Sequence, residues 1–108
     1  MKLWVDDVRP CPHTDGSWFH ARSVNQAKGW IKTFEMWNNE VFDIECPLEV
    51  IDIDHDAGEF AKDGGDYIRL LDWLEETGRS YPIHIHSMNP VGVQNMRRII
   101  EKNEWTEV

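Results

Sequence analysis

The segment 48–58, LEVIDIDHDAG, decides the fold. Its first half is a short run rich in β-branched residues, which is typical of a buried strand. Its second half places three aspartates and a histidine within the five residues 52–56. A solvated surface loop would hold this charge at little cost, whereas a metal or phosphate site would require a group of this kind. The other strands of the chain decide between these two interpretations.

The composition is that of an acidic globular domain. The 108 residues are 41% hydrophobic and 11% aromatic, so we expect a single domain over 1–108 with one core. The net charge of −9 argues against an extended nucleic-acid-binding surface. Because no apolar run has the length of a membrane span or a signal peptide, we expect a cytoplasmic protein without membrane contact. Cys11 and Cys46 lack metal-type spacing, which favours free thiols over a disulfide.

Strand-like and helix-like segments alternate along the chain. This alternation predicts crossover connections, a mainly parallel sheet and a small, open, three-layer α/β fold. Ser23 and Gln26 form a capping box before the first helix, and Asn89-Pro90 opens the last one. The expected strands cover 3–5, 18–22, 48–53, 83–85 and, as a short edge strand, 105–108; the expected helices cover about 24–37, 67–74 and 90–100, with loops at 9–17 and 57–65.

Charged and polar side chains follow three of the expected strands at the point where each strand ends. Because the carboxyl ends of parallel strands meet at one edge of a sheet, where α/β folds place their ligands, we expect these side chains to converge. In strand order they are Asp6, Asp7 and Arg9; Asp54, His55 and Asp56; and His86, Ser87 and Asn89.

The acidic members of this group suit a hard divalent cation. Neighbouring carboxylates repel one another unless their pKa values rise or a cation lies among them. Mg²⁺ prefers oxygen ligands and keeps waters and phosphate oxygens beside one or two carboxylates. We therefore expect Asp6, Asp7 and Asp54 to hold Mg²⁺ or Mn²⁺.

The remaining members suit a phosphate and a proton transfer. Arg9 can bind a phosphate with two hydrogen bonds, and the helix start at Asn89 offers free N–H groups, with Ser87 beside them. His86 is placed as a general acid–base or a metal ligand. His55, with Asp56 orienting it, is the alternative proton carrier.

Each of these signals also has a purely structural interpretation. Asp6-Asp7 alone is typical of a solvated turn, Asn89 of a helix N-cap and Ser87 of a partner for a backbone group. Asp52 alternates with two isoleucines and is expected to point away from the site. Trp4 is expected in the core.

Three blocks of the sequence resemble a known family. LWVDDVRPCP (3–12), IDIDHDAG (51–58) and IHIHSMNPVGVQNM (83–96) are similar to the signature blocks of the cyclic-phosphate-processing receiver-like domains, small proteins of bacteria and phages. The resemblance spans about residues 3–100. It differs in the central block, where the family pattern usually reads LDHDLG and this chain carries Ile53 and Ala57 in place of two leucines.

The resemblance implies a receiver-like, flavodoxin-type fold, somewhat truncated, that recognises or processes a cyclic phosphate on a nucleotide or RNA end. Matched to the family's blocks are the acidic pair Asp6-Asp7 with Arg9, the central Asp54, His55 and Asp56, and the last block's His86, Ser87 and Asn89.

True receivers carry a lysine after a fifth strand, which speaks against a standard phosphoacceptor cycle here. Beyond residue 62 the only lysine is Lys102, at the end of the last expected helix.

Three functions remain open on this basis. The first is a metal-dependent phosphoesterase or phosphate-binding enzyme that uses the residues above. The second is a non-catalytic receiver-like module that binds a nucleotide or partner protein, with or without phosphorylation of Asp54. The third is an acidic adaptor whose strand-end charges are solvated.

Overall fold

A parallel sheet of four strands forms the centre of the molecule. The computed structural model describes residues 1–40 and 48–108. Within them the sheet has the strand order β2-β1-β3-β4, and every pair of neighbouring strands is parallel, as the sequence predicts. The strands are β1 (Lys2–Val5), β2 (Trp18–Ala21), β3 (Val50–Ile53) and β4 (Ile83–Ile85).

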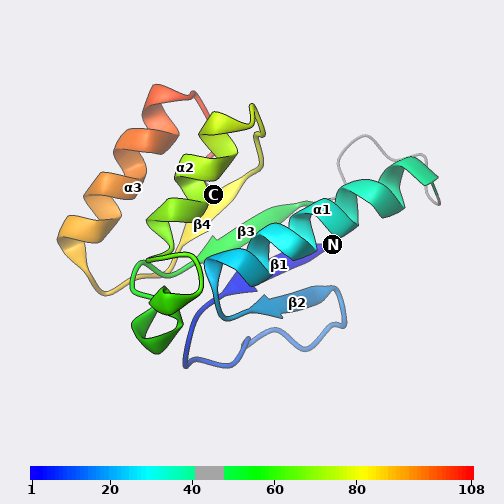
Figure 1. Cartoon of the computed structure of the whole chain (residues 1–108), viewed down its shortest axis with the longest axis horizontal. Coiled ribbons are helices and arrows are strands. Elements are labelled where there is room, and N and C mark those ends of the chain that lie inside the picture. The colour runs from blue at the N-terminus through cyan, green and yellow to red at the C-terminus, as the bar shows by residue number, and fades with distance from the viewer. Residues whose placement is uncertain (41–47) are drawn as a thin grey trace.

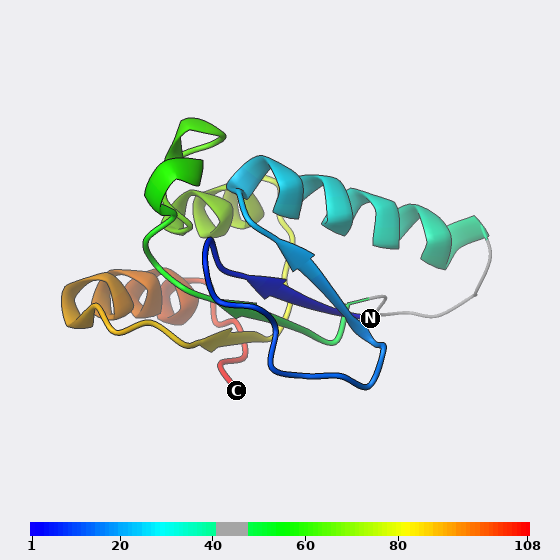
Figure 2. The same cartoon turned by 90° about the horizontal axis from the view of Figure 1, so that it is seen from below.

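The helices lie on one side of this sheet, as Figures 1 and 2 show together. They are α1 (Val24–Glu40), α2 (Ile68–Glu76) and α3 (Pro90–Lys102), with a short 3-10 helix, η1 (Gly58–Lys62), before α2. The connection between β1 and β2 contains no helix. The open, parallel, receiver-like α/β architecture is thus confirmed, and the layer on the second face is a loop, residues 6–17, instead of helices.

The helix ends follow from local hydrogen bonds that the sequence predicts. The Ser23 hydroxyl accepts a hydrogen bond from the Gln26 N–H at 3.0 Å, and the Gln26 side chain accepts one from the Arg22 N–H at 2.8 Å. These bonds satisfy N–H groups that a helix start leaves free. At α3 the Asn89 side chain accepts from the Gly92 N–H at 3.0 Å, directly before Pro90.

Strand alternation gives the sheet two unlike faces. The odd-numbered residues of β1 and β3 face the helices and are 0% exposed, as with Leu3 and Ile51, so the apolar core lies between sheet and helices. The even-numbered residues face the other way. There Trp4 pairs in register with Asp52, and Asp52 with His84.

The structure departs from the expected elements at three places. The expected loop 57–65 contains η1, because its glycines allow a tight helical turn. The expected strand 105–108 is a single parallel bridge between Ile83 and Glu107. Strand β3 begins at Val50, two residues later than predicted. Cys46 lies outside the described residues, so the expectation of free thiols is met only at Cys11.

No helix among the described residues is long and apolar enough to cross a membrane.

A glycine in α3 gives a test of how β3 and α3 pack together. A Cβ added at Gly92 would lie 2.4 Å from Cγ of His55. We expect Gly92→Ala to lower the free energy of unfolding by about 1–3 kcal/mol, because the added methyl overpacks this contact. Urea denaturation followed by circular dichroism measures the change.

The matched control is Gly29→Ala in α1, where a Cβ would meet no heavy atom within 4 Å. There we expect a gain of about 0.5–1 kcal/mol from helix propensity alone. The double variant Gly92→Ala/His55→Ala recovers most of the loss if the His55 ring is the obstacle. A Gly92→Ala protein as stable as wild type would contradict the packing.

Candidate functional site

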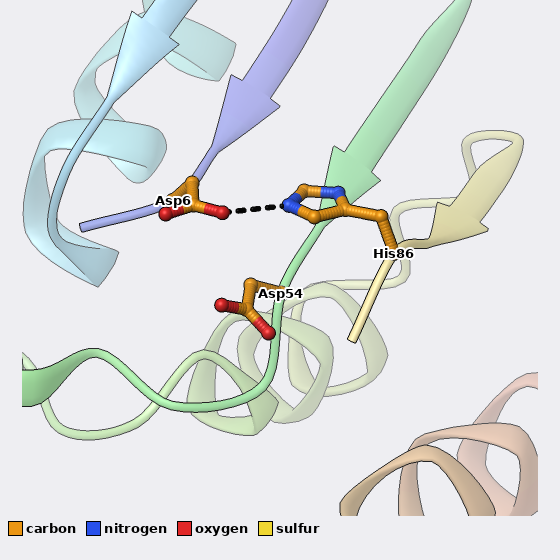
Figure 3. A group of neighbouring side chains, drawn as sticks. All are labelled: Asp6, Asp54 and His86. Atoms are coloured by element: carbon orange, nitrogen blue, oxygen red, sulfur yellow. Dashed lines mark hydrogen bonds and ion pairs between the residues drawn. The ribbon is translucent and has the colours of Figure 1, made fainter. Parts of the chain in front are cut away.

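The site begins one residue beyond the ends of three neighbouring strands. Val5 pairs in register with Ile53, and Ile53 with Ile85. The next residue of each strand is Asp6, Asp54 and His86. One ligand atom from each of these three lies within 4.8 Å of those from the other two, and Figure 3 shows their side chains together. Three of the residues predicted from strand ends are therefore brought into one group.

His86 lies between two buried carboxylates. Its Nε2 is 2.9 Å from Oδ2 of Asp6, and its Nδ1 is 2.6 Å from Oδ1 of Asp52. Asp6 is 0% exposed and Asp52 is 7% exposed. An ionised carboxylate only accepts hydrogen bonds, so when both carboxylates are charged both ring nitrogens donate and the ring carries a positive charge. The three side chains join the ends of β1, β3 and β4 in one line of hydrogen bonds.

The pKa of His86 is raised by this arrangement. Burial by itself lowers the pKa, but the hydrogen bonds and charges of Asp52 and Asp6 outweigh it. The cation is also covered by an aromatic ring. The indole of Trp4 stacks on the imidazole with ring centroids 4.0 Å apart and planes 3° apart. This contact adds cation–π attraction and limits rotation of the imidazole.

Asp6 has both carboxylate oxygens in use. Oδ1 accepts hydrogen bonds from the backbone N–H groups of Val8 and Arg9 at 3.0 and 2.8 Å, and Oδ2 faces His86. Burial raises the pKa of Asp6, but these bonds together lower it overall. Asp6 is therefore an anion at neutral pH. The backbone bonds hold the turn that brings Arg9 back over the site.

Asp7 occupies the other side of the strand end. Its Oδ2 would lie 2.4 Å from a Cβ at Gly58, so a larger residue there would displace the Asp7 carboxylate and would also have to adopt a φ of 56°. Burial raises the pKa of Asp7, and the negative charges of Asp6 and Asp54 raise it further. A carboxylate with a pKa raised by its neighbours marks a place where a cation would relieve repulsion.

Asp54 and Tyr67 complete the acidic region. Oδ1 of Asp54 accepts a hydrogen bond from the His55 N–H at 2.7 Å. The fully buried Tyr67 donates its hydroxyl to the Arg22 carbonyl at 2.7 Å. Burial and the nearby charges of Asp7, Asp6 and Asp54 raise the pKa of Tyr67, which keeps it a neutral donor.

His55 and Asp56 form a second, adjacent group. Nδ1 of His55 lies 2.9 Å from Oδ1 of Asp56 and 3.4 Å from the side-chain nitrogen of Asn89. Asn89 also caps α3 through Gly92, so one of the N–H groups predicted to receive a phosphate already has a partner. His55 is not a member of the candidate metal group formed by Asp6, Asp54 and His86.

Arg9 and Ser87 lie at the rim of the site. Nη1 of Arg9 is 3.5 Å from the His86 carbonyl, and its guanidinium is exposed. The Ser87 hydroxyl accepts a hydrogen bond from the Asn89 N–H at 3.1 Å, which is the structural role weighed against phosphate binding. Phosphate contact by Arg9, Ser87 and Asn89 stays a prediction.

One residue of the site was assigned wrongly from the sequence. Asp52 was expected to point away, but it binds His86, because both lie on the face opposite to the helices. Trp4 is buried, as expected, but it packs on His86 and lies outside the apolar core cluster. Side-chain alternation was the available signal. In β1, β3 and β4 the odd-numbered residues are apolar, so the even-numbered residues 4, 6, 52, 54 and 86 are expected on the same, opposite face of the sheet.

His20 also contacts the end of β1. Its Nε2 lies 2.8 Å from the carbonyl oxygen of Asp6, so it supports the same strand end.

The chain belongs to the cyclic-phosphate processing receiver domain family, whose sequence pattern it matches over residues 1–102. This confirms the resemblance predicted from the three sequence blocks. No curated protein and no solved structure matches the chain. Family membership associates this receiver-like domain with cyclic-phosphate processing. The group Asp6, Asp54 and His86 could hold a metal ion there.

The donor set fits a divalent cation. Asp6 and Asp54 supply carboxylate oxygens, which Mg²⁺ and Mn²⁺ prefer, and the pKa of Asp7 is raised first by burial and then by the charges of these two carboxylates. Nε2 of His86 is a ligand only when it has lost its proton.

The protonation of His86 can be measured directly. We expect the His86 ring to titrate above 6.5, its ordinary value, and at a lower pH in Asp52→Asn, where one carboxylate partner is neutral. NMR of the ring C–H groups across pH measures both midpoints, and His86→Gln assigns the signal. A wild-type midpoint at or below 6.5 would contradict the assigned cation.

The shifted pKa values of His86 and Asp6 also determine how the free energy of unfolding depends on pH. Because the folded-state pKa of His86 is raised, its contribution is fully present below pH 6.5 and is lost as pH rises through the folded-state value. Because the pKa of Asp6 is lowered, its contribution is present above pH 3.8 and is lost as pH falls. We expect urea unfolding to show a falling stability on both sides, with the alkaline decline absent in His86→Gln.

Proposed function

We propose that this domain binds Mg²⁺ or Mn²⁺ and hydrolyses a cyclic phosphate on a nucleotide or RNA end. The observation that carries the proposal is the His86 ring held between the carboxylates of Asp52 and Asp6, with Asp54 beside it, at the meeting point of three parallel strands. Membership of a family associated with cyclic-phosphate processing supports the substrate class.

One set of residues would bind the metal ion, and another would transfer a proton. Asp6 and Asp54 hold the metal ion, and Asp7 adds negative charge beside them. A bound ion would supply Lewis-acid polarisation of the phosphate and would offset its negative charge. Arg9 has an exposed guanidinium above the His86 carbonyl and binds a second phosphate oxygen.

His86 acts as the proton donor. In hydrolysis the oxygen of a water molecule forms a bond to phosphorus, one ring P–O bond breaks, and the leaving oxygen takes the Nε2 proton of His86. The proton of the attacking water passes to a neighbouring carboxylate. Asp52 retains the Nδ1 hydrogen bond throughout, so it is a positioning residue that fixes the ring and stabilises its charge.

The proposal is tested with nucleoside 2′,3′-cyclic phosphates in the presence of Mn²⁺ or Mg²⁺. We expect turnover in wild type and a loss of about 10²–10⁴-fold in kcat for His86→Gln, since general acid catalysis contributes about this much. We expect Asp54→Asn to lose metal binding, which is measured by tryptophan fluorescence or by calorimetry. His84→Gln is the matched control, because His84 is exposed on β4 and bonds the Val108 carbonyl.

Unchanged turnover in both His86→Gln and Asp54→Asn would exclude this site. Ligand binding in wild type without any turnover would instead favour a second candidate, a non-catalytic receiver-like module. The observation behind that candidate is the place of Asp54, one residue beyond β3, with a hydroxyl residue, Ser87, following β4. Lys102 lies in the last turn of α3 and forms an ion pair with Glu75 at 3.3 Å. It is therefore not the lysine that would bind a phosphoryl group on Asp54.

The second candidate has its own measurement. Incubation with a small phosphodonor and Mg²⁺ would add one phosphoryl group to wild type and none to Asp54→Asn, as read by mass spectrometry of the intact protein.

A further inference from the structure

Three exposed apolar side chains lie in the loops that follow β1 and β4 and in the first turn of α3, next in sequence to residues of the site. Val8 is 74% exposed, Met88 is 82% exposed and Val91 is 67% exposed. Val8 stands between Asp7 and Arg9 in the loop after β1, and Met88 stands between Ser87 and Asn89 in the loop after β4. Val91 follows in the first turn of α3. We call Val8, Met88 and Val91 the apolar rim.

Hydrogen bonds connect the apolar rim to the site. The N–H of Val8 donates to Oδ1 of Asp6 at 3.0 Å, so the Val8 backbone contacts the group directly. The Arg9 guanidinium reaches the His86 carbonyl at 3.5 Å, and this contact joins the loop of Val8 to the loop of Met88. The two loops that carry Val8 and Met88 therefore meet beside the Asp6–His86 group.

The rim contains three of the six large apolar side chains that are exposed among the described residues. The other large apolar side chains that are exposed there are Met36 and Trp37 on α1 and Val108 near the C-terminus. Apolar groups gathered beside a polar site mark a binding surface. A stable protein interface buries about 800 Å² on each partner, which is far more than three side chains provide. A small flat molecule is the occupant that this area suits.

Charge explains why such a contact is needed. The chain carries a net charge of −9, and Asp6, Asp7 and Asp54 meet the ligand at the site. An anionic ligand gains little from the protein's overall field, even with a cation present, so its uncharged part has to supply binding free energy.

We propose that the apolar rim binds the nucleobase of the ligand whose phosphate lies at the Asp6–His86 group. This inference rests on the proposed function. Met88 offers a polarisable sulfur that contacts aromatic faces favourably, Val8 offers a branched apolar surface, and the Arg9 guanidinium between them and His86 is planar and stacks on aromatic rings. The rim thus makes the site select a nucleoside phosphate over a phosphate without a base.

The test compares two ligands on the full chain with Mg²⁺. One is a nucleoside 2′,3′-cyclic phosphate, and the other is ribose 2,3-cyclic phosphate, which lacks the base. Calorimetry measures both Kd values for wild type, Val8→Ser, Met88→Ser and the double variant. The matched controls are Met36→Ser and Val108→Ser, which change exposed residues of the same types away from the site.

We expect wild type to bind the nucleoside ligand about 10-fold or more tightly than the base-free ligand, given about tenfold per 1.4 kcal/mol. The double variant loses this preference and keeps its affinity for the base-free ligand, while both controls retain the preference. Because the substituted side chains are exposed, thermal unfolding is expected to remain unchanged and serves as the folding check.

The other outcomes are distinct. Equal affinity of wild type for the two ligands, or a preference that survives in the double variant, overturns the base-binding rim and leaves the proposed function standing. Binding of neither ligand overturns both. A third ligand is a short oligoribonucleotide that ends in the same cyclic phosphate. If it binds more tightly than the free nucleotide and the rim substitutions weaken this binding, the bound base belongs to an RNA end. If its binding is equal or weaker, the bound base belongs to a free nucleotide, and both results support the rim.

Discussion

The rest of the structure depends on the imidazolium of His86 between the carboxylates of Asp6 and Asp52. Burying one carboxylate costs several kcal/mol unless it is paired, and here two are buried at neighbouring strand ends. A single cation with two opposed N–H donors compensates both. The pairing also restricts the orientation of the ring, since each nitrogen has to face its own carboxylate, and the Trp4 indole stacks on the ring.

This constraint accounts for the unlike faces of the sheet. The face toward the helices is apolar and closes the core, as Leu3, Ile51 and Ile53 show. The opposite face carries Trp4 and Asp52 and is covered by the loop 6–17. A helix in that place would present an apolar stripe to charged side chains, whereas a loop offers carbonyl and N–H groups. The Arg9 carbonyl accepts the Trp4 indole N–H at 2.9 Å in this way.

The sequence predicted those parts of the molecule that depend on local pattern. Parallel strands, helix caps at Ser23 and Asn89, and the convergence of Asp6, Asp54 and His86 follow from periodicity and from the geometry of parallel sheets.

What the sequence did not predict depends on contacts between distant residues. Asp52 was misassigned because alternation gives the face of a side chain and does not say what the opposite element places there. His86 is 34 residues away from Asp52, and only the register of β3 with β4 brings them together. The separation of His55 from the main group has the same origin, since its position is fixed by close packing on Gly92 in α3.

The distance along the chain between Asp6 and His86, 80 residues, affects how the protein is made. All strand pairs are parallel and none closes through a tight hairpin, so every contact in the sheet requires a long loop to close first. During synthesis the N-terminal carboxylates leave the ribosome long before their cationic partner. Until β4 docks, Asp6 and Asp52 lack their shared imidazole partner. The complete site therefore forms only with β4, and a chain that stops before β4 lacks the proton donor that joins its two buried carboxylates.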